Sequence, residues 1–374
     1  MITAADHHHM ARALQLAARG LHTTDPNPRV GCVLVRDGQV VGEGWHQRAG
    51  DGHAEYIALQ AAGSRARGST AYITLEPCCH HGRTPPCTDA LIAAGVARVV
   101  AAMQDPNVRV AGGGLAQLRA AGIQVHCGLL ETEARALNPG FIRRMESGRP
   151  YFRLKLAMSL DGRTALESGE SRWITGEAAR LDVQQWRARS SAILTGANTV
   201  LADDPSLNVR LPDTRRQPLR VILDPRLRTP PQARLLDLPG EVLILSASED
   251  PRRIARLRER GASVARVDSD HQGLDLAAVA RELARREMNE VHVECGATLA
   301  GAFLEARLLD ELVVYLAPSV LGDSARGLFR LAPLGGMRER IEFHIAGIRA
   351  VGQDWRIIAH PQVLSRGTNA VSSR

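Results

Sequence analysis

The sequence predicts an α/β protein with two domains. At 374 residues, the chain is longer than one hydrophobic core usually organises. Short apolar runs alternate with amphipathic segments along most of its length, which predicts largely parallel sheets covered by helices on both faces. A run of turn-forming residues, Ser147-Gly148-Arg149-Pro150, separates the two halves. We therefore expect domains at 1–148 and 149–361, followed by a polar tail at 362–374.

The first half begins with a helix that we expect Asp6 to cap and Gly20 to end. Asp37-Gly38 is a strong signal for a two-residue hairpin turn between apolar runs. The expected strands are residues 30–36, 39–44, 69–75, 97–103 and 123–127, and the expected helices are 53–62, 87–94, 112–121 and 131–146. In such a sheet, residues that open helices after strands meet at one edge.

The second half restarts the pattern and is expected to form a second α/β domain. Its predicted strands are 151–158, 192–195, 219–224, 241–246, 263–267, 291–295, 312–317 and 341–348, and its predicted helices are 177–188, 251–260, 275–287 and 298–306. From about His360 onward the residues are polar and aperiodic, so we expect them to fray.

The most informative chemistry lies in the first half, where His53 and Glu55 are followed by Cys78 and Cys87. One imidazole and two thiolates make three zinc ligands and leave a fourth position for water, which is a catalytic arrangement. Glu55 is poorly placed as a ligand but well placed to move protons between water and a substrate nitrogen. The pattern is that of zinc deaminases, although the gap between the cysteines is longer here. Cys79 remains an alternative ligand.

The fold pattern predicts that these four groups lie together at helix N-termini. There the positive end of each helix dipole would favour thiolate over thiol at the two cysteines. The six cysteines do not suggest a disulfide framework in a chain of this length.

Composition indicates the kind of partner. The net charge of +7 and a pI near 9.5 suit an anion, but aromatic residues are only 3%, too few for the stacking that single-stranded nucleic acids require. The sequence therefore favours a phosphorylated small molecule over nucleic acid. There is no apolar run of membrane-spanning length, and the first residues do not resemble a secretion signal, so we expect a cytoplasmic enzyme with no membrane partner.

The second half has no G-x-G-x-x-G after a strand, so a Rossmann interpretation lacks its main support. Residues 291–301 instead run from a strand through Gly296 into a helix, where backbone N–H groups could hold a phosphate. An ordinary glycine-containing turn is the alternative. Two polar clusters at strand ends, 155–163 and 199–210, carry charges that a phosphate ester and a sugar could engage.

Several stretches together resemble the bifunctional riboflavin biosynthesis proteins, which join a diaminohydroxyphosphoribosylaminopyrimidine deaminase to a 5-amino-6-(5-phosphoribosylamino)uracil reductase. The stretches that carry the resemblance are 25–33, 53–55, 74–87, 159–164, 169–175, 202–205 and 294–301. The resemblance implies a three-layer cytidine-deaminase-like fold for the first half and a dihydrofolate-reductase-like α/β fold for the second. It also implies Zn²⁺ and NADPH as cofactors, phosphoribosyl pyrimidines as substrates, and a homo-oligomer formed through the reductase domain.

The resemblance also implies roles for individual residues. The implied zinc ligands are His53, Cys78 and Cys87, and the implied catalytic residues are Glu55 and Lys155. The implied NADPH contacts are Ala157, Trp173, Thr199, Asp203, Gly296, Ala297, Thr298, Leu299, Ala300, Gly301 and Ala302. The implied substrate contacts are Asn27, His46, His80, His81 and Arg83 in the first half, and Ser171, Arg187, Leu207, Arg210 and Glu294 in the second. The chain departs from the family pattern at Cys79 and at Pro225, where relatives often carry small polar residues.

Three other hypotheses fit parts of the sequence. One is a tRNA or nucleoside deaminase with an unrelated second domain, which would need no NADPH. Another is a zinc-stabilised nucleic-acid-binding module, which would normally need a fourth protein ligand. The third, a reductase with a degenerate deaminase half, is disfavoured because every expected ligand and Glu55 are present.

Overall fold

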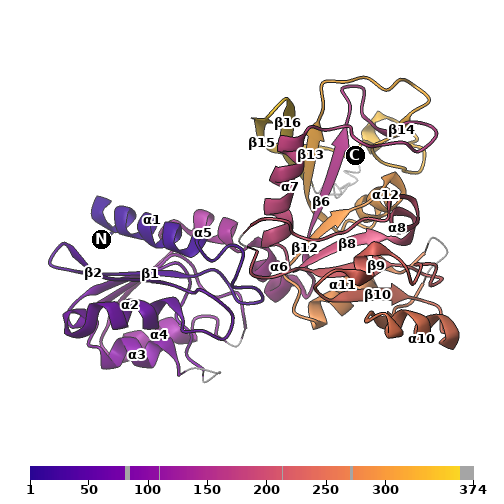
Figure 1. Ribbon diagram of the computed structural model, residues 1–374. Coiled ribbons are helices and arrows are strands. Elements are labelled where there is room, and N and C mark those ends of the chain that lie inside the picture. The colour runs from indigo at the N-terminus through magenta and orange to yellow at the C-terminus, as the bar shows by residue number, and fades with distance from the viewer. Residues whose placement is uncertain (81–84, 109, 213, 270–272, 363–374) are drawn as a thin grey trace, which may run out of the picture.

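The computed structural model describes residues 1–80, 85–108, 110–212, 214–269 and 273–362. It has two lobes, each built around its own sheet (Figure 1). The first lobe contains a five-stranded sheet and the second a nine-stranded sheet. The predicted α/β fold class is confirmed.

The first sheet has the strand order β2-β1-β3-β4-β5. Its strands are β1 (Gly31–Arg36), β2 (Gln39–Trp45), β3 (Thr70–Ile73), β4 (Arg98–Ala101) and β5 (Gln124–Cys127). The pairs β3–β4 and β4–β5 are parallel, whereas β1 is antiparallel to both neighbours. The expected largely parallel sheet is therefore only half correct, because the Asp37-Gly38 hairpin reverses the chain.

Helices cover both faces of this sheet (Figure 1). On one face lie α1 (Ala4–Ala18) and α5 (Glu131–Leu137), and on the other α2 (Ala54–Ala62), α3 (Cys87–Ala93) and α4 (Gly113–Ala120), with a short 3-10 turn at Gly63–Ala66. Thr3, not Asp6, is the N-cap of α1, while Asp6 completes the capping box from the first turn. The single helix expected at 131–146 is two helices, because Pro139 begins a separate α6 (Pro139–Ser147).

The second sheet has the order β11-β10-β9-β8-β12-β6-β13-β16-β15. Its strands are β6 (Tyr151–Met158), β8 (Ala192–Gly196), β9 (Leu219–Leu223), β10 (Val242–Ser246), β11 (Ser263–Arg266), β12 (Glu290–Glu294), β13 (Leu309–Leu316), β15 (Phe343–Val351) and β16 (Asp354–Pro361). The strands from β11 to β13 are parallel, and β16 and β15 follow antiparallel. A two-stranded ribbon joins β7 (Arg163–Ala165) to β14 (Arg326–Gly327).

The end of the chain departs from the sequence prediction. Strand β16 was not predicted, and His360 lies within it rather than in a frayed end. A turn at Gly352, whose φ of 64° favours glycine, returns the chain so that β16 pairs with both β13 and β15. The predicted tail at 362–374 lies outside the described residues apart from Gln362.

Helices also cover both faces of the second sheet. Those that pack on one face are α7 (Glu177–Arg189), α8 (Ala197–Asp203), α9 (Arg234–Asp237) and α10 (Pro251–Glu259), and those on the other are α11 (Leu276–Arg285) and α12 (Ala297–Glu305), with a 3-10 turn at Met337–Glu339. Phe152 of β6 packs against Phe303 of α12 with ring centroids 5.0 Å apart, at the centre of the larger core. Among the described residues, no helix has the length and apolar character needed to cross a membrane.

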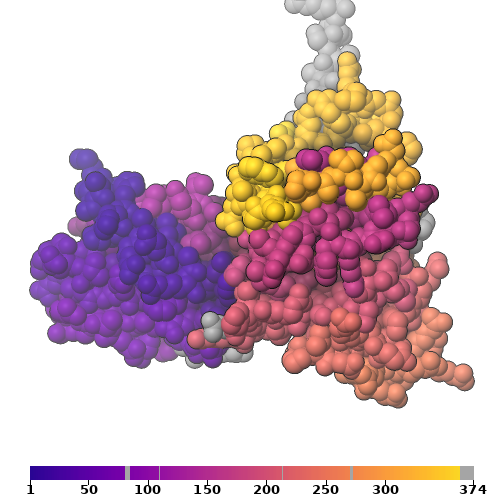
Figure 2. All heavy atoms as spheres, turned by 45° about the horizontal axis from the view of Figure 1, so that its top comes forward, coloured from indigo at the N-terminus to yellow at the C-terminus, as the bar shows by residue number. Residues whose placement is uncertain are grey.

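The two lobes lie side by side, and Figure 2 shows the first lobe in indigo to purple beside the second. The contact includes the loop at 24–30, helix α6 and the residues that begin β8 and β12. Gly140 of α6 is needed for this approach, because a Cβ there would lie 2.6 Å from the Asn289 carbonyl oxygen. The carboxyl-terminal end of β3 in the first lobe faces this contact, since β3 ends beside Gly31, which follows the 24–30 loop.

Candidate active sites

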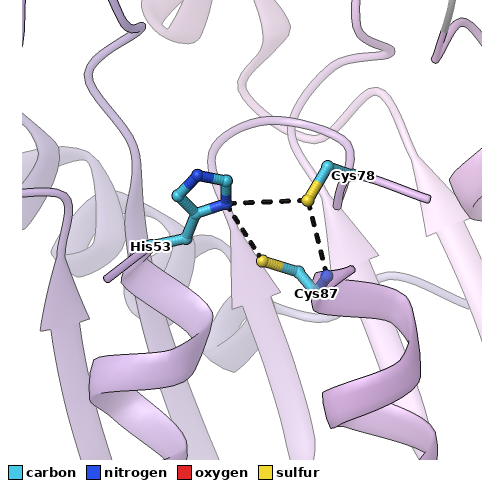
Figure 3. Close-up of side chains that lie close together, drawn as sticks. All are labelled: His53, Cys78 and Cys87. Atoms are coloured by element: carbon cyan, nitrogen blue, oxygen red, sulfur yellow. Dashed lines mark hydrogen bonds between the residues drawn. The ribbon is translucent and has the colours of Figure 1, made fainter. Parts of the chain in front are cut away.

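The first site contains the three predicted zinc ligands (Figure 3). His53 is the N-cap of α2, Cys87 is the first residue of α3, and Cys78 lies in the segment after β3. His53 Nδ1 lies 3.2 Å from Cys87 Sγ and 3.6 Å from Cys78 Sγ. Tetrahedral zinc with ordinary Zn–N and Zn–S bonds separates its ligand atoms by about 3.6 to 3.8 Å. The donor set and its spacing therefore fit zinc.

The environment of the site favours thiolate at Cys78. Hydrogen bonds, first from the Cys87 thiol and then from His53, lower the pKa of Cys78 despite partial burial. The prediction that Cys78 opens a helix is wrong, since it lies in a loop. The Cys87 N–H at the start of α3 nevertheless points to Cys78 Sγ at 3.4 Å, so the helix end still supports its charge.

Cys79 lies apart from this group. The ligand set formed by the described residues is His53, Cys78 and Cys87. The Cys79 sulfur instead lies against α4, 3.1 Å from where a Cβ on Gly113 would be. The arrangement supports three protein ligands rather than four.

Glu55 lies in the first turn of α2 and its residue surface is only 3% exposed. Burial raises the pKa of this carboxyl to about 7, with Cys78 adding to the shift and His53 opposing it. A carboxyl with a pKa near neutrality can both accept and release a proton during one reaction. Its side chain is not needed to complete the set of three ligand atoms.

Two further predicted residues lie beside the ligands. The ring of His46 lies 5.5 Å from that of His53, and Asn27 Nδ2 lies 3.0 Å from His46 Nε2. His46 is buried, and its Nδ1 lies 3.1 Å from the Gly52 carbonyl oxygen, which fixes the ring. His80 is exposed, and the predicted contacts His81 and Arg83 lie outside the described residues.

The second site is a cavity of about 1,910 Å³ at the carboxyl end of the parallel strands. The predicted residues that line it are Lys155, Ala157, Ser171, Trp173, Arg187, Thr199, Asp203, Leu207, Arg210, Glu294, Gly296, Ala297, Thr298, Leu299 and Ala302. Ala300 and Gly301 are not among the residues that line it. They lie on the buried side of α12, where a Cβ on Gly301 would lie 2.0 Å from the Arg330 carbonyl oxygen. Glycine is needed there for close packing.

The charges in this cavity centre on one ion pair. Glu294 accepts from Arg187 Nε at 2.5 Å and from Nη2 at 2.8 Å. Burial alone would raise the pKa of Glu294, but Arg187 holds it well below its usual range. Burial lowers the pKa of Lys155, an effect that Glu294 opposes. Lys155 and Glu294 are register partners on the parallel strands β6 and β12, so a cation and a carboxylate lie side by side there.

The sequence did not single out several cations of this cavity. The arginines that line it besides the predicted ones are Arg172, Arg180, Arg226, Arg228, Arg234 and Arg326. Arg180 stacks on the exposed ring of Trp173, with its guanidinium carbon 4.7 Å from the ring centroid. Arginines are scattered along the whole chain, so no local pattern distinguishes these from surface residues.

Two family models match the chain, one for each lobe. Residues 3–103 match the cytidine and deoxycytidylate deaminase zinc-binding region, and residues 150–357 match the RibD C-terminal domain. The fold, the metal ligands and these matches define a zinc-dependent deaminase joined to a reductase.

Whole-chain relatives identify the family. The chain is 53% identical to the riboflavin biosynthesis protein RibD of Escherichia coli, with 93% of this chain and 97% of that protein covered. The Haemophilus influenzae RibD is 48% identical, with coverages of 94% and 96%. The chain belongs to the RibD family and is a bifunctional deaminase and reductase of riboflavin biosynthesis. Its cofactors are zinc and NADPH, as predicted.

Solved structures agree over nearly the whole chain. Acinetobacter baumannii RibD superposes with a TM-score of 0.90 at 46% identity, with 96% of this chain and 99% of that chain covered. A Thermotoga maritima diaminohydroxyphosphoribosylaminopyrimidine deaminase/5-amino-6-(5-phosphoribosylamino)uracil reductase superposes with a TM-score of 0.85 at 33% identity and the same coverages. Membership of this family rules out the unrelated second domain and the nucleic-acid-binding module that were considered from the sequence.

Proposed function

We propose that the first site deaminates 2,5-diamino-6-(5-phosphoribosylamino)pyrimidin-4(3H)-one and that the second reduces 5-amino-6-(5-phosphoribosylamino)uracil to its ribityl product. The activities in the name of the Thermotoga maritima relative support this pair of substrates. The observation that carries the proposal is the group of His53, Cys78 and Cys87 with a buried carboxyl, Glu55, beside it.

In the deaminase, His53, Cys78 and Cys87 are the residues that hold zinc. When bound, zinc acts as a Lewis acid that makes water nucleophilic near neutral pH. Glu55 takes the proton from the attacking water and passes it to the amino group, which leaves as ammonia. Glu55 is buried beside these ligands, where both transfers take place. Asn27 and His46 hold the pyrimidine against the ligand group.

The phosphate of this substrate requires cations beyond the metal. We assign this role to His80 and Arg83 on the resemblance, although Arg83 lies outside the described residues. The excess of basic over acidic residues, 47 against 40, fits substrates that carry a phosphate.

In the reductase, NADPH when bound supplies the hydride for C1 of the ribosyl group. We assign to Lys155, which lines this cavity, the donation of a hydrogen bond or a proton to the ribosyl oxygen as the ring opens, and to Glu294 and Arg187 the orientation of the substrate. The other proposed substrate contacts are Ser171, Leu207 and Arg210. The proposed cofactor contacts are Ala157, Trp173, Thr199, Asp203, Gly296, Ala297, Thr298, Leu299 and Ala302. Their position around one large cavity supports these roles.

The substitution Glu55→Gln tests the proposal. It keeps the shape of the side chain but can no longer accept or release a proton, so deamination should fall by about 10³-fold. Zinc content and NADPH oxidation on deaminated substrate should not change. Glu43→Gln is the matched control, because Glu43 pairs with Arg12 on the surface of the same lobe, away from the ligands. Equal loss of both activities in Glu55→Gln would contradict separate sites.

The proposal includes domains at 1–148 and 149–361, a tail at 362–374, a location in the cytoplasm and a homo-oligomer formed through the reductase domain.

Strand β15 is the edge of the second sheet, and it is exposed along most of its length. Ile345, Ile348 and the neighbouring Trp355 are 53%, 55% and 49% exposed, which supports a second copy of the chain as the group that covers them. Ile348→Lys should reduce the sedimentation mass to that of the monomer, whereas Val40→Lys on exposed β2 should not.

A further inference from the structure

The loop at 24–30 carries Asn27, one of the two residues assigned above to the pyrimidine pocket, and has no helix or strand of its own. Its conformation therefore depends on what its other residues contact. Asp25 and Arg29, two residues to either side of Asn27, both make hydrogen bonds to the second lobe.

The contacts of Asp25 lie where strands β8 and β12 begin. Asp25 Oδ1 accepts from Ser191 Oγ at 2.7 Å and from Asn289 Nδ2 at 3.2 Å, and Oδ2 lies 3.3 Å from Arg216 Nη1. Asn289 Nδ2 also donates to the Pro26 carbonyl oxygen at 2.8 Å. One amide group of the reductase lobe thus holds both the side chain of Asp25 and the backbone immediately before Asn27.

The groups that hold the loop are themselves held firmly. Ser191 Oγ accepts from the backbone N–H groups of Asn289 and Glu290 at 2.8 and 3.1 Å. Asn289 Oδ1 accepts from Arg144 Nε at 2.7 Å, so the orientation of the amide is fixed. Both Ser191 and Asn289 are buried, at 2% and 5% exposed. Such satisfied networks have little freedom to move.

On the far side of the loop, Asn138 of the first lobe holds the Arg29 backbone, and the Arg29 side chain reaches the second lobe. Arg29 Nη1 donates to Glu290 Oε1 at 2.7 Å and to the Leu137 carbonyl oxygen at 2.6 Å. Glu290 is 1% exposed and also pairs with Arg153 at 2.8 Å and Arg189 at 3.0 Å. Asn27 therefore lies in sequence between two anchors, one on Asn289 immediately before β12 and one on Glu290, the first residue of β12.

We propose that Ser191, Asn289 and Glu290 of the reductase lobe are positioning residues of the deaminase, which hold the loop so that Asn27 meets His46 in the pyrimidine pocket. The proposal rests on the role assigned to Asn27 above. It makes the deaminase pocket depend on the reductase lobe, although the zinc ligands and Glu55 all come from the first lobe.

Asn289→Asp is the direct test. Its second oxygen replaces the amide donor and repels both Asp25 and the Pro26 carbonyl, while Arg144 neutralises the new charge and keeps the side chain in place. Losing contacts of this kind costs about tenfold in binding, so the KM of the deaminase should rise about tenfold with kcat within about threefold. Zinc content and reductase kcat/KM should stay within about twofold of the unaltered chain.

The double variant Asp25→Asn with Asn289→Asp restores one donor facing one acceptor. Its deaminase KM should be at least about threefold lower than that of Asn289→Asp alone. A general loss of fold stability would instead also lower the zinc content and the reductase kcat/KM. Arg143→Gln is the control, because it breaks another contact between the lobes, the 3.0 Å pair with Asp310, without touching the loop. Its deaminase KM should not change. If Asn289→Asp does not fold, Asn289→Ser replaces it, since serine is too short to reach the loop and adds no charge.

The results separate this inference from the function on which it rests. If Asn27→Ala leaves the deaminase KM unchanged, the assigned role of Asn27 is wrong and the inference fails with it. If Asn27→Ala raises KM but Asn289→Asp does not, only the positioning role is overturned. An equal rise in Arg143→Gln would overturn it too, because the effect would then be a general loosening of the contact between the lobes.

Discussion

Arg187 on α7 and Glu294 at the end of β12 form a bidentate ion pair inside the reductase cavity, with N–O distances of 2.5 and 2.8 Å. Arg187 also donates to the Asn208 carbonyl oxygen at 2.9 Å, which fixes the guanidinium on the segment that leads to Arg210. Glu294→Gln removes the charge that compensates Arg187. We expect reductase kcat/KM to fall by about 10²-fold, because misplacement of a positioning group by about 1 Å costs that much.

The measurement is the loss of nicotinamide absorbance on deaminated substrate, with ammonia release as the internal reference. Deamination should remain within about twofold, since the zinc ligands belong to the other lobe. Glu282→Gln is the control: Glu282 pairs with Arg285 and Arg286 on α11, away from the cavity lining. A reductase that tolerates Glu294→Gln would show that the ion pair is only structural.

Zinc should be held by three protein ligands, so Cys79→Ser should keep about one zinc per chain while Cys87→Ser should lose it. Cys79 lies against Gly113 of α4 rather than with the ligand atoms. Elemental analysis of the purified variants measures this directly. Loss of zinc from Cys79→Ser would instead indicate a fourth ligand and a closed, structural site.

Removal of zinc by a chelator should abolish ammonia release and leave NADPH oxidation intact. The first lobe should stay folded, because its two apolar clusters, one on each face of the sheet, do not depend on the metal. Circular dichroism before and after chelation checks this. Unfolding of the lobe on chelation would mean that the metal supplies folding energy, as in structural sites.

Much of the site could be predicted from the sequence because its chemistry is carried by local patterns. His53 and Glu55 are two residues apart at the start of a helix, and the two cysteines follow in one short segment. Strand β6 has the predicted limits of 151–158, because its residues are apolar except for Arg153 and Lys155 and turn-forming residues lie on both sides of it. Such signals need no knowledge of how distant segments meet.

What could not be predicted depends on contacts between distant parts of the chain. The Arg29–Glu290 pair joins residues 261 positions apart, and nothing near either residue indicates the other. Strand β16 is recognisable only because β13 and β15 provide partners on both sides. Gly301 belonged to a motif expected to bind the cofactor, yet packing against Arg330 explains its glycine.

The stability of the first lobe should depend on pH through Asp6, which is 2% exposed. Its carboxylate accepts from Arg98 Nη1 at 2.6 Å, Tyr72 Oη at 2.7 Å and the Thr3 backbone N–H at 2.7 Å. Burial alone would raise the pKa of Asp6, but these donors, Arg98 first, lower it far below the usual value near 4. Breaking this network by Asp6→Asn should cost about 2 to 4 kcal/mol of unfolding free energy at pH 7.

The direction of the pH effect follows from the depressed pKa of Asp6. In the unfolded chain this carboxyl takes up a proton near pH 4, whereas in the folded chain it stays ionised to much lower pH. Its contribution is therefore complete above about pH 5 and declines as the pH falls through 4 and below. Urea unfolding gives the unfolding free energy of the unaltered chain and of Asp6→Asn. The difference between the two should be constant from pH 7 to about 5 and should narrow towards pH 3. Asp37→Asn is the control: its unfolding free energy should differ from that of the unaltered chain by no more than about 0.5 kcal/mol, because the Asp37 side chain is 89% exposed. A gap for Asp6→Asn that stayed the same at every pH would mean that lost packing, not the charged network, accounts for the cost.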